Sequence, residues 1–331
     1  MRLRRGLSSI FAAVIGIVFL LPVAIGLMQG KVIEIELVKP KTAKEALQQA
    51  YTKHFQEKDY QGAIERYRWI VERFPDSDEA IEAQYRIGNI YQWNLVEPER
   101  AIQEYEKLRE RYPESDYAVV ALIRIGECYG RMKEYEREIK YCKQVIEKYP
   151  DSDFVAEAKA VMAGTLLHEL GKFDEARDVY EDILTNHPNS DFSDDAKLWL
   201  VFISHWKHEI STREAMKKYE ALLNDESLSH KARAGAQYMI GYSYYIQGEW
   251  DKAIESFRKV LIRFPNIDYD AKAETLYFIG FLYEKRGDLL KAKEKFREVI
   301  ERYPKSIWVN RARSRIERVE RKLIKLSKKE E

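Results

Sequence analysis

Two histidines and two cysteines are the residues of this chain whose types and spacing could most readily do chemistry. His205 and His208 lie three positions apart in "SHWKHE", with Glu209 beside them. On a helix that spacing lets two imidazoles share a metal ion, but no third ligand is evident, so we expect packing and surface roles. Cys128 and Cys142 are too few for a disulfide framework or a metal set. The sequence therefore predicts no metal site and no cofactor.

The sequence motifs of common enzymes are incomplete in this chain. "GYSYY" lacks the closing glycine of a nucleophile elbow. "GTLLHELGKF" contains Gly-Lys at the wrong spacing and has Phe173 where a phosphate-binding loop needs Ser or Thr. We therefore expect a non-enzymatic protein, whose function depends on the surfaces that its structural elements expose.

The composition is that of a folded protein without a broad nucleic-acid-binding surface. Of the 331 residues, 45% are hydrophobic and 34% are charged, which is too apolar for a disordered chain. The net charge of +1 is unevenly spread, because residues 1–30 carry +3, residues 31–304 carry −8 and residues 305–331 carry +6. Since nucleic-acid binding needs a basic face, the acidic body argues against nucleic acid as a ligand.

The N-terminal sequence, residues 1–30, predicts a membrane-targeting segment. Three arginines precede an uncharged stretch over residues 7–28, which is long enough to span a bilayer. The basic flank should remain cytoplasmic, so the rest of the chain should be exported. Alternatively, Pro22 breaks this stretch and a small-x-small sequence follows it, as in a cleaved signal peptide. Residues 1–30 are thus a transmembrane anchor or a signal peptide, and residues 31–41 form a tether.

A recurring proline organises the body of the chain into repeats with a period of about 38 residues, which indicates a solenoid. The spacing of the prolines is nearly constant, except for one interval of twice the usual length that contains a degenerate unit. Proline ends a helix because it lacks an N–H and clashes with the preceding turn. A Ser or Asp that can cap the next helix follows most of these prolines. The prolines are Pro75, Pro113, Pro150, Pro188, Pro265 and Pro304.

A glycine also recurs at a constant distance before the proline in most units, and an alanine follows several of these glycines. A mid-helix glycine costs about 1 kcal/mol relative to alanine, so its recurrence predicts two antiparallel helices in close approach, glycine facing alanine. Large aromatic residues would then fill the gaps between neighbouring pairs. Gly88 lies one position farther from its proline than the other glycines do, which predicts an insertion in the turn of that unit.

Two units depart from this pattern. In unit three, Glu138 replaces the alanine and Cys142 replaces the large aromatic residue, whereas in unit five Ile203 replaces the glycine. We therefore expect these two units to pack less tightly than the others.

These features resemble the tetratricopeptide repeat (TPR) family over residues 42–304. The resemblance implies an all-α, right-handed solenoid of about seven helix-pair repeats, closed by a basic capping helix at residues 305–331. The long period resembles TPR proteins of the bacterial envelope, such as the TPR lipoprotein of the β-barrel assembly machinery and the periplasmic TPR partner of the Tol-Pal system. One complete match to the signature consists of Gly241, Tyr244, Ala253, Phe257 and Pro265.

TPR proteins resemble one another in binding ligands on the inner face of their first helices. Tyrosine suits such recognition because it offers a large area, few torsions and a polar tip. Alternatively, these rings pack between adjacent first helices. Counting from each glycine gives the candidate partner-binding residues Tyr85, Asn89, Trp93, Arg131, Tyr238, Tyr242, Tyr245, Tyr277 and Phe281.

Taken together, the sequence predicts a scaffold or adaptor in the bacterial cell envelope. We expect its body to lie in the periplasm, or to be secreted after signal cleavage, and to bind a partner protein or an extended peptide in the groove. The partners would be other envelope proteins, and the membrane through the N-terminal segment. The alternative is a self-associating structural protein, a homo-oligomer in which basic residues 305–331 dock on an acidic neighbour.

Overall fold

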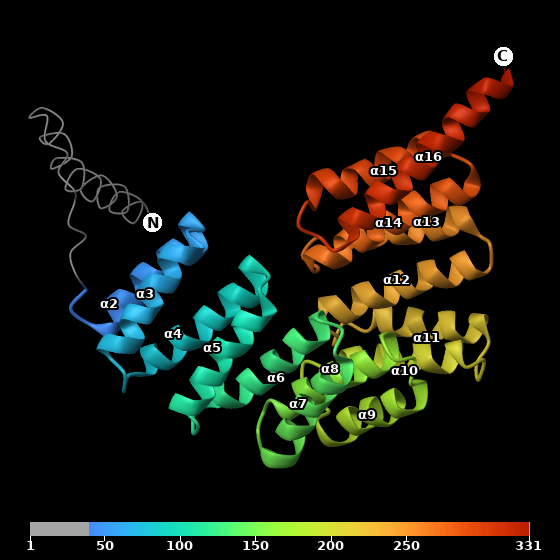
Figure 1. The fold of residues 1–331 in the computed structure, drawn as a ribbon. Coiled ribbons are helices and arrows are strands. Elements are labelled where there is room, and N and C mark those ends of the chain that lie inside the picture. Colours follow the sequence, from blue (N-terminus) through green and yellow to red (C-terminus); the bar gives the residue numbers. More distant parts are fainter. Residues whose placement is uncertain (1–39, 331) are drawn as a thin grey trace, which may run out of the picture. The chain divides into compact units, whose positions relative to one another are not determined.

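A computed structural model describes residues 40–330, and every regular element in that range is a helix (Figure 1). The predicted N-terminal membrane segment lies outside the described residues. No helix between residues 40 and 330 combines the length and the apolar character needed to cross a bilayer. The helices are α2 (Ala43–Tyr51), η1 (Thr52–Glu57), α3 (Tyr60–Arg73), α4 (Asp78–Asn89), η2 (Ile90–Leu95), α5 (Pro98–Arg111), α6 (Asp116–Arg131), α7 (Tyr135–Lys148), α8 (Val155–His168), α9 (Phe173–Asn186), α10 (Ser193–Trp206), α11 (Thr212–Asn224), α12 (His230–Ile246), α13 (Trp250–Arg263), α14 (Tyr269–Arg286), α15 (Leu289–Arg302) and α16 (Trp308–Glu330).

The chain divides into two compact subdomains, and the boundary between Ala83 and Gln84 falls within α4. In the first subdomain, α2 packs against α3 around the fully buried Tyr67. The Thr42 side chain caps α2 and the Asp59 side chain caps α3, each accepting a hydrogen bond from a backbone N–H of the first turn. The first subdomain is therefore a capped helix pair with its own small core.

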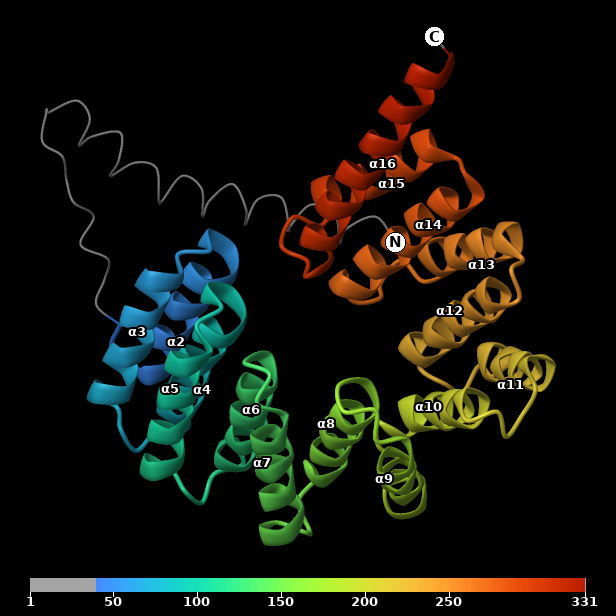
Figure 2. The same ribbon diagram turned by 45° about the vertical axis from the view of Figure 1, so that its right-hand side comes forward.

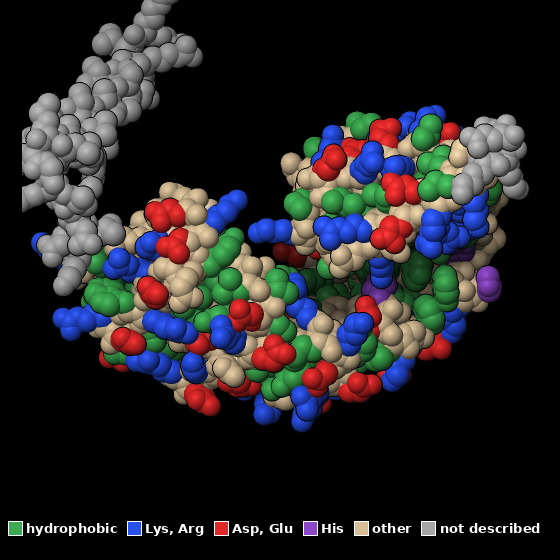
Figure 3. All heavy atoms as spheres, turned by 45° about the horizontal axis from the view of Figure 1, so that its top comes forward, with side chains coloured by type: hydrophobic (Ala, Val, Ile, Leu, Met, Phe, Trp, Pro, Cys, Tyr) green, Lys and Arg blue, Asp and Glu red, His purple; other side chains and the backbone are tan. Residues whose placement is uncertain are grey.

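In the second subdomain, each helix lies against the one before it, and the helices form successive pairs (Figures 1 and 2). Helix α16 follows the last pair, α14–α15. Additional contacts join α6 to α8, α10 to α12 and α14 to α16, so first helices of neighbouring pairs also contact one another. The first helices therefore make up one layer of the solenoid and the second helices the other. On the face shown in Figure 3, Lys and Arg side chains are interspersed with Asp and Glu.

Proline and serine mark the junctions between pairs, as the sequence predicts. Tyr112 and Phe264 each precede a proline and end their helices with non-helical backbone angles, because proline disfavours the helical conformation of the preceding residue. Ser115 then caps α6, and its Oγ accepts a hydrogen bond from the N–H of Ala118 at 3.3 Å. Each junction therefore ends one helix and positions the start of the next pair.

In the pairs α12–α13 and α14–α15, the atoms nearest to the glycine of the first helix belong to an aromatic ring rather than to an alanine. A methyl group on Gly241 would lie 3.1 Å from the Phe257 ring, and one on Gly280 would lie 2.9 Å from the Phe296 ring. The space left by the missing side chain is thus filled by the ring from the second helix of the same pair, rather than by a ring between pairs.

In unit three, which consists of α6 and α7, the glycine allows the two helices to approach closely, as predicted. The atoms nearest to a methyl group on Gly126 would be the Glu138 carbonyl oxygen at 3.3 Å and the Tyr141 Cβ at 3.4 Å. Because Cys142 is small, the backbone of α7 lies directly against α6 at this point. The expectation of looser packing is therefore wrong for this unit. In unit five, by contrast, α10 and α11 contact each other less extensively than the helices of the complete pairs.

The sequence predicts the extra residue of the α4–α5 pair in the turn between the helices. In the structure it lies inside the first helix instead. Helix α4 continues into the π-helical segment η2, which ends at Leu95 and is followed by Val96 with a φ of 59°. A π-helical turn accommodates one additional residue without ending the helix. The insertion places Trp93 and Asn94 at the end of the first helix rather than in a lengthened loop.

Candidate functional site

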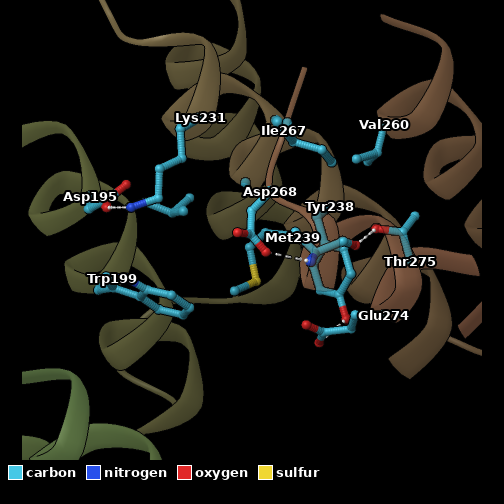
Figure 4. Close-up of a pocket in the computed structure, with 14 residues that line it drawn as sticks. Asp195, Trp199, Lys231, Tyr238, Met239, Val260, Ile267, Asp268, Glu274 and Thr275 are labelled. Atoms are coloured by element: carbon cyan, nitrogen blue, oxygen red, sulfur yellow. Dashed lines mark hydrogen bonds and ion pairs between the residues drawn. The ribbon is translucent and has the colours of Figure 1, made fainter. Parts of the chain in front are cut away.

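A pocket of about 270 Å³ opens between α10, α12 and the start of α14 (Figure 4). All three are first helices, so the pocket lies in the layer where TPR-like arrays are expected to bind. In Figure 4, Trp199 and Lys231 lie on one side, Tyr238, Glu274 and Thr275 on the other, and Met239 and Asp268 between them. The site is therefore built from residues of three successive units that are far apart in the sequence.

Most of the pocket wall is apolar. Leu198, Met239 and Val260 are buried, and Trp199 and Ile267 complete the wall with partly buried side chains. A methyl group on Gly235 would lie 2.6 Å from Leu198 Cδ2, so a larger residue at this position of α12 would displace the end of the Leu198 side chain of α10. The pocket can thus receive an apolar group without rearrangement of its walls.

The polar groups of the pocket are mostly acidic. The Tyr238 hydroxyl donates a hydrogen bond to Glu274 Oε1 at 2.9 Å, and burial raises the pKa of the Glu274 carboxyl above its usual range. Asp268 caps α14 by accepting from the N–H groups of Asp270 at 2.7 Å and Ala271 at 3.1 Å. Asp195, in turn, pairs with Lys231. Three carboxylates therefore line the pocket, against one ammonium group that is already paired.

A row of aromatic rings continues from the pocket along the inner layer. Tyr238 contacts Phe278 with 6.0 Å between ring centroids, and Phe278 contacts Phe281 at 6.2 Å. Tyr245 lies 5.8 Å from both Tyr242 and Phe281. Tyr242, Tyr245 and Phe281 are all partly exposed, so this row offers ring surface to a ligand.

Matches to two family models identify the family of this fold. Family models described as "Tetratricopeptide repeat" match residues 82–115, 120–152 and 161–190 in one case and residues 233–305 in the other, together just over half of the chain. The chain belongs to the tetratricopeptide repeat family. Members of this family are generally non-catalytic scaffolds for protein interactions. A search of curated proteins finds no significant match.

A solved TPR structure shares the fold over most of the chain. A tetratricopeptide repeat protein from Parabacteroides merdae matches with a TM-score of 0.60 and 13% identity, covering 82% of this chain and 96% of that one. PilW, a type IV pilus biogenesis factor, matches with a TM-score of 0.48 and 16% identity over 71% of this chain and 98% of its own. PilF from Pseudomonas aeruginosa matches with a TM-score of 0.46 and 16% identity over 68% and 93%.

Of the residues predicted on the inner face of the C-terminal TPR units, Tyr277 is the most buried. It is 8% exposed and packs against Phe296 and Trp308 with centroid distances of 5.4 and 5.0 Å. Its hydroxyl accepts a hydrogen bond from Arg315 Nε at 3.2 Å. Tyr277 thus anchors α16, whereas the other predicted rings of these units keep part of their surface free.

The remaining predicted residues form a second group on α4, η2 and α6. The Arg131 guanidinium lies over the Trp93 ring at 4.1 Å from its centroid, and Trp93 is 48% exposed. Asn89 accepts a hydrogen bond from the Tyr105 hydroxyl at 2.7 Å. The Tyr85 hydroxyl accepts one from Arg124 at 3.3 Å. Trp93 and Arg131 are therefore open to a ligand, while Tyr85 and Asn89 have partners within the chain.

Sequence reasoning missed Trp199, Asp268 and Glu274. Glu274 lies three positions before Tyr277 on α14, so extending the same helical spacing by one more turn would have found it. Trp199 directly precedes Leu200, the residue that the same helical spacing places on the inner stripe of unit five, so the count passed it by one position. Asp268 precedes α14 and belongs to the site only through the packing of its loop.

The two histidines do not form a helical pair. Helix α10 ends at Trp206, and His208 lies in the following turn with a φ of 60°. His205 Nε2 lies 3.1 Å from Thr212 Oγ1 instead. The premise that both imidazoles share one helical face is therefore wrong, and no group of three potential metal ligands occurs among the described residues.

Proposed function

We propose that this TPR protein is a non-enzymatic scaffold that holds an extended segment of a partner protein along α10, α12 and α14. The observation that carries the proposal is the continuity between the pocket and the aromatic row. Tyr238 lines the pocket and also begins the chain of ring contacts that leads through Phe278 to Phe281. An extended segment could therefore place one side chain in the pocket and lay its neighbours across the rings.

The energetics favour such a division of roles. Binding energy at interfaces is concentrated in a few aromatic and well-packed groups, with the other contacts mainly excluding water. Tyr242 and Tyr245 are rigid rings with polar tips, so ordering them on binding loses little conformational entropy. Trp93 and Arg131, on the second group, would add a separate contact for a longer partner, with Tyr85 and Asn89 supporting it.

The cellular setting belongs to the same proposal. Residues 1–30 would be a membrane anchor or a cleaved signal peptide, and residues 31–41 a tether that leads to the TPR array at residues 42–304. The partner would then be another protein of the bacterial envelope, met outside the cytoplasm. The basic residues before the apolar stretch support this orientation.

Self-association is a second candidate function, which the end of α16 favours. The α16 helix projects beyond α15 (Figures 1 and 2), and Ile324 and Leu326 are 55% and 52% exposed. Against it, the buried Glu284 carboxylate already pairs with Arg315, Arg318 and Lys322, so three cations of the cap are used within the chain. The dependence of mass on concentration in sedimentation separates this function from the first.

A crosslinking pull-down from membranes tests the scaffold. The full chain is compared with a variant carrying Tyr242→Ser, Tyr245→Ser and Phe281→Ser, and with an Ile262→Ser control on the exposed side of α13, where Ile262 is 75% exposed. We expect the parent and the control to capture a partner that the triple variant loses. Capture of the same proteins by all three would overturn the inner-face site.

A further inference from the structure

We propose that the pocket binds the side chain of an arginine or lysine in the partner segment, and so selects extended segments that carry a basic residue. This inference rests on the proposed function, because it specifies what the pocket recognises in a segment lying on the inner face.

The size of the pocket limits its occupant to one side chain. At about 270 Å³ it is smaller than the clefts of about 300–1,000 Å³ that hold whole small molecules. Its walls are apolar over most of their area and include Leu198, Met239 and Val260. A long aliphatic stem can therefore be removed from water along these walls while a polar group at its end reaches the carboxylates.

The charges of the pocket determine which polar group fits. Lys231 pairs with Asp195, which leaves Asp268 and Glu274 without a cationic partner among the lining residues. Asp268 receives backbone N–H groups at the start of α14, but these do not cancel its charge. The occupant thus meets a net negative site, and a guanidinium or an ammonium group complements it.

Glu274 is the group with most to gain from a cation. It accepts a hydrogen bond from the Tyr238 hydroxyl, which is a neutral donor. The charged groups that act on it are Arg311 of α16, which favours its ionised form, and Asp270, which opposes it. The Arg311 guanidinium lies over the Trp308 ring, 4.5 Å from its centroid. A carboxylate held partly out of water is stabilised by a paired cation, which a basic ligand would supply.

The aromatic walls favour the same ligand. Trp199 and Tyr238 lie on opposite sides of the pocket in Figure 4, and cations bind favourably over the faces of such rings. An aliphatic side chain would fill the volume but leave Glu274 facing apolar atoms. An acidic side chain would add a fourth carboxylate. Of the three classes, a basic side chain satisfies both the walls and the charges.

A peptide selection on the purified full-length protein tests the inference. A library of random short peptides is selected for binding, and an enriched peptide is resynthesised with each arginine replaced by citrulline, a neutral group of the same shape. We expect enrichment of basic residues and a loss of affinity of about tenfold or more for the citrulline peptide, which corresponds to about 1.4 kcal/mol.

The Glu274→Gln variant assigns that loss to the pocket. Glutamine can still accept the Tyr238 hydrogen bond but carries no charge. The variant should therefore lose most of the preference for the arginine peptide over the citrulline peptide. Glu255→Gln is the matched control, because Glu255 is exposed on α13 and lies outside the pocket. It should leave the preference for arginine unchanged.

Two negative results have different meanings. If selected peptides are released by the triple aromatic variant but bind equally with arginine or citrulline, the inference fails and the scaffold function stands. If peptides bind regardless of the triple variant, the inner-face site fails, and the inference fails with it. As an independent readout, lower pH should weaken only the arginine peptide, since burial raises the pKa of Glu274 and protonation removes its charge.

Discussion

The α14–α15 and α6–α7 pairs place a glycine at the same position of their first helix, yet different atoms lie against it. In α14–α15, the Phe296 ring fills the space beside Gly280. In α6–α7, the corresponding residue is Cys142, and the backbone of residue 138 lies against Gly126 instead. In these two pairs, the residue at the aromatic position therefore determines whether the glycine accommodates a ring or brings two backbones together.

The two pairs also differ in the side chains that lie beside their first helices. In the C-terminal pairs, rings from both helices meet, as Tyr277 and Phe296 do at 5.4 Å between centroids. In unit three the buried Glu138 carboxylate lies beside Gly130 and accepts a hydrogen bond from Thr165 Oγ1 at 2.8 Å. The pairs that use rings thus support the aromatic site, whereas in unit three a hydrogen-bonded carboxylate lies beside the first helix.

The largest expected effect comes from removing the ring. Phe296 is fully buried, so Phe296→Ala should destabilise the protein by about 3–5 kcal/mol through lost burial and the remaining cavity. Cys142→Ala removes one buried sulfur in the corresponding position and should cost only about 1 kcal/mol. Urea denaturation of both variants measures the difference. Equal losses would mean that the ring and the thiol contribute equally to their pairs.

A smaller effect, which depends on pH, is expected at Glu138. Burial raises the pKa of this carboxyl to about 7, and Glu127 and Glu169 act in the same direction, while the Thr165 hydrogen bond opposes them. The unfolded carboxyl titrates near 4.5. Between these values the native state binds more protons, so the contribution of Glu138 to stability is fully present below 4.5 and falls as the pH rises to about 7.

The variant Glu138→Gln isolates this contribution. At pH 8 it should be more stable than the parent by up to about 3 kcal/mol, because it removes the buried charge. At pH 4 the two proteins should be similar, since the parent carboxyl is then neutral. Urea midpoints at both pH values give the comparison. A difference that does not change with pH would exclude the buried carboxylate as its cause.

Much of the fold follows from the sequence because each TPR unit repeats the same local rules. The prolines and the capping serines predict where helices end and begin, and the family signature predicts how they pair. The contacts of Gly241 and Gly280 could not be predicted in the same way, because spacing alone does not distinguish a neighbouring alanine from a neighbouring ring. Similarly, the count of residues after Gly88 reveals an insertion but not that a π-helical turn absorbs it.

The candidate site was less accessible to such reasoning. The helical stripe contained Tyr242, Tyr245 and Phe281 because their positions are defined within single helices. The pocket depends on side chains that three units bring together, among them Asp195, Lys231 and Glu274. No pattern within one helix specifies that arrangement. Tyr277 shows the complementary difficulty, because its position on the stripe is right for a ligand while the packing of α16 buries it.

The smallest expected change in stability distinguishes a glycine that contacts a ring from a glycine that has open space beside it. A methyl group on Gly280 would meet the Phe296 ring at 2.9 Å, whereas one on Gly164, in the interior of α8, would have no side-chain or distant backbone atom within 4 Å. Gly280→Ala should therefore destabilise the protein by about 1–2 kcal/mol, because overpacking outweighs the gain in helix propensity. Gly164→Ala should stabilise it by about 0.5–1 kcal/mol through propensity alone. The distinction is supported if the urea midpoint falls for Gly280→Ala and rises for Gly164→Ala. If both midpoints rise, the ring beside Gly280 moves aside at little cost.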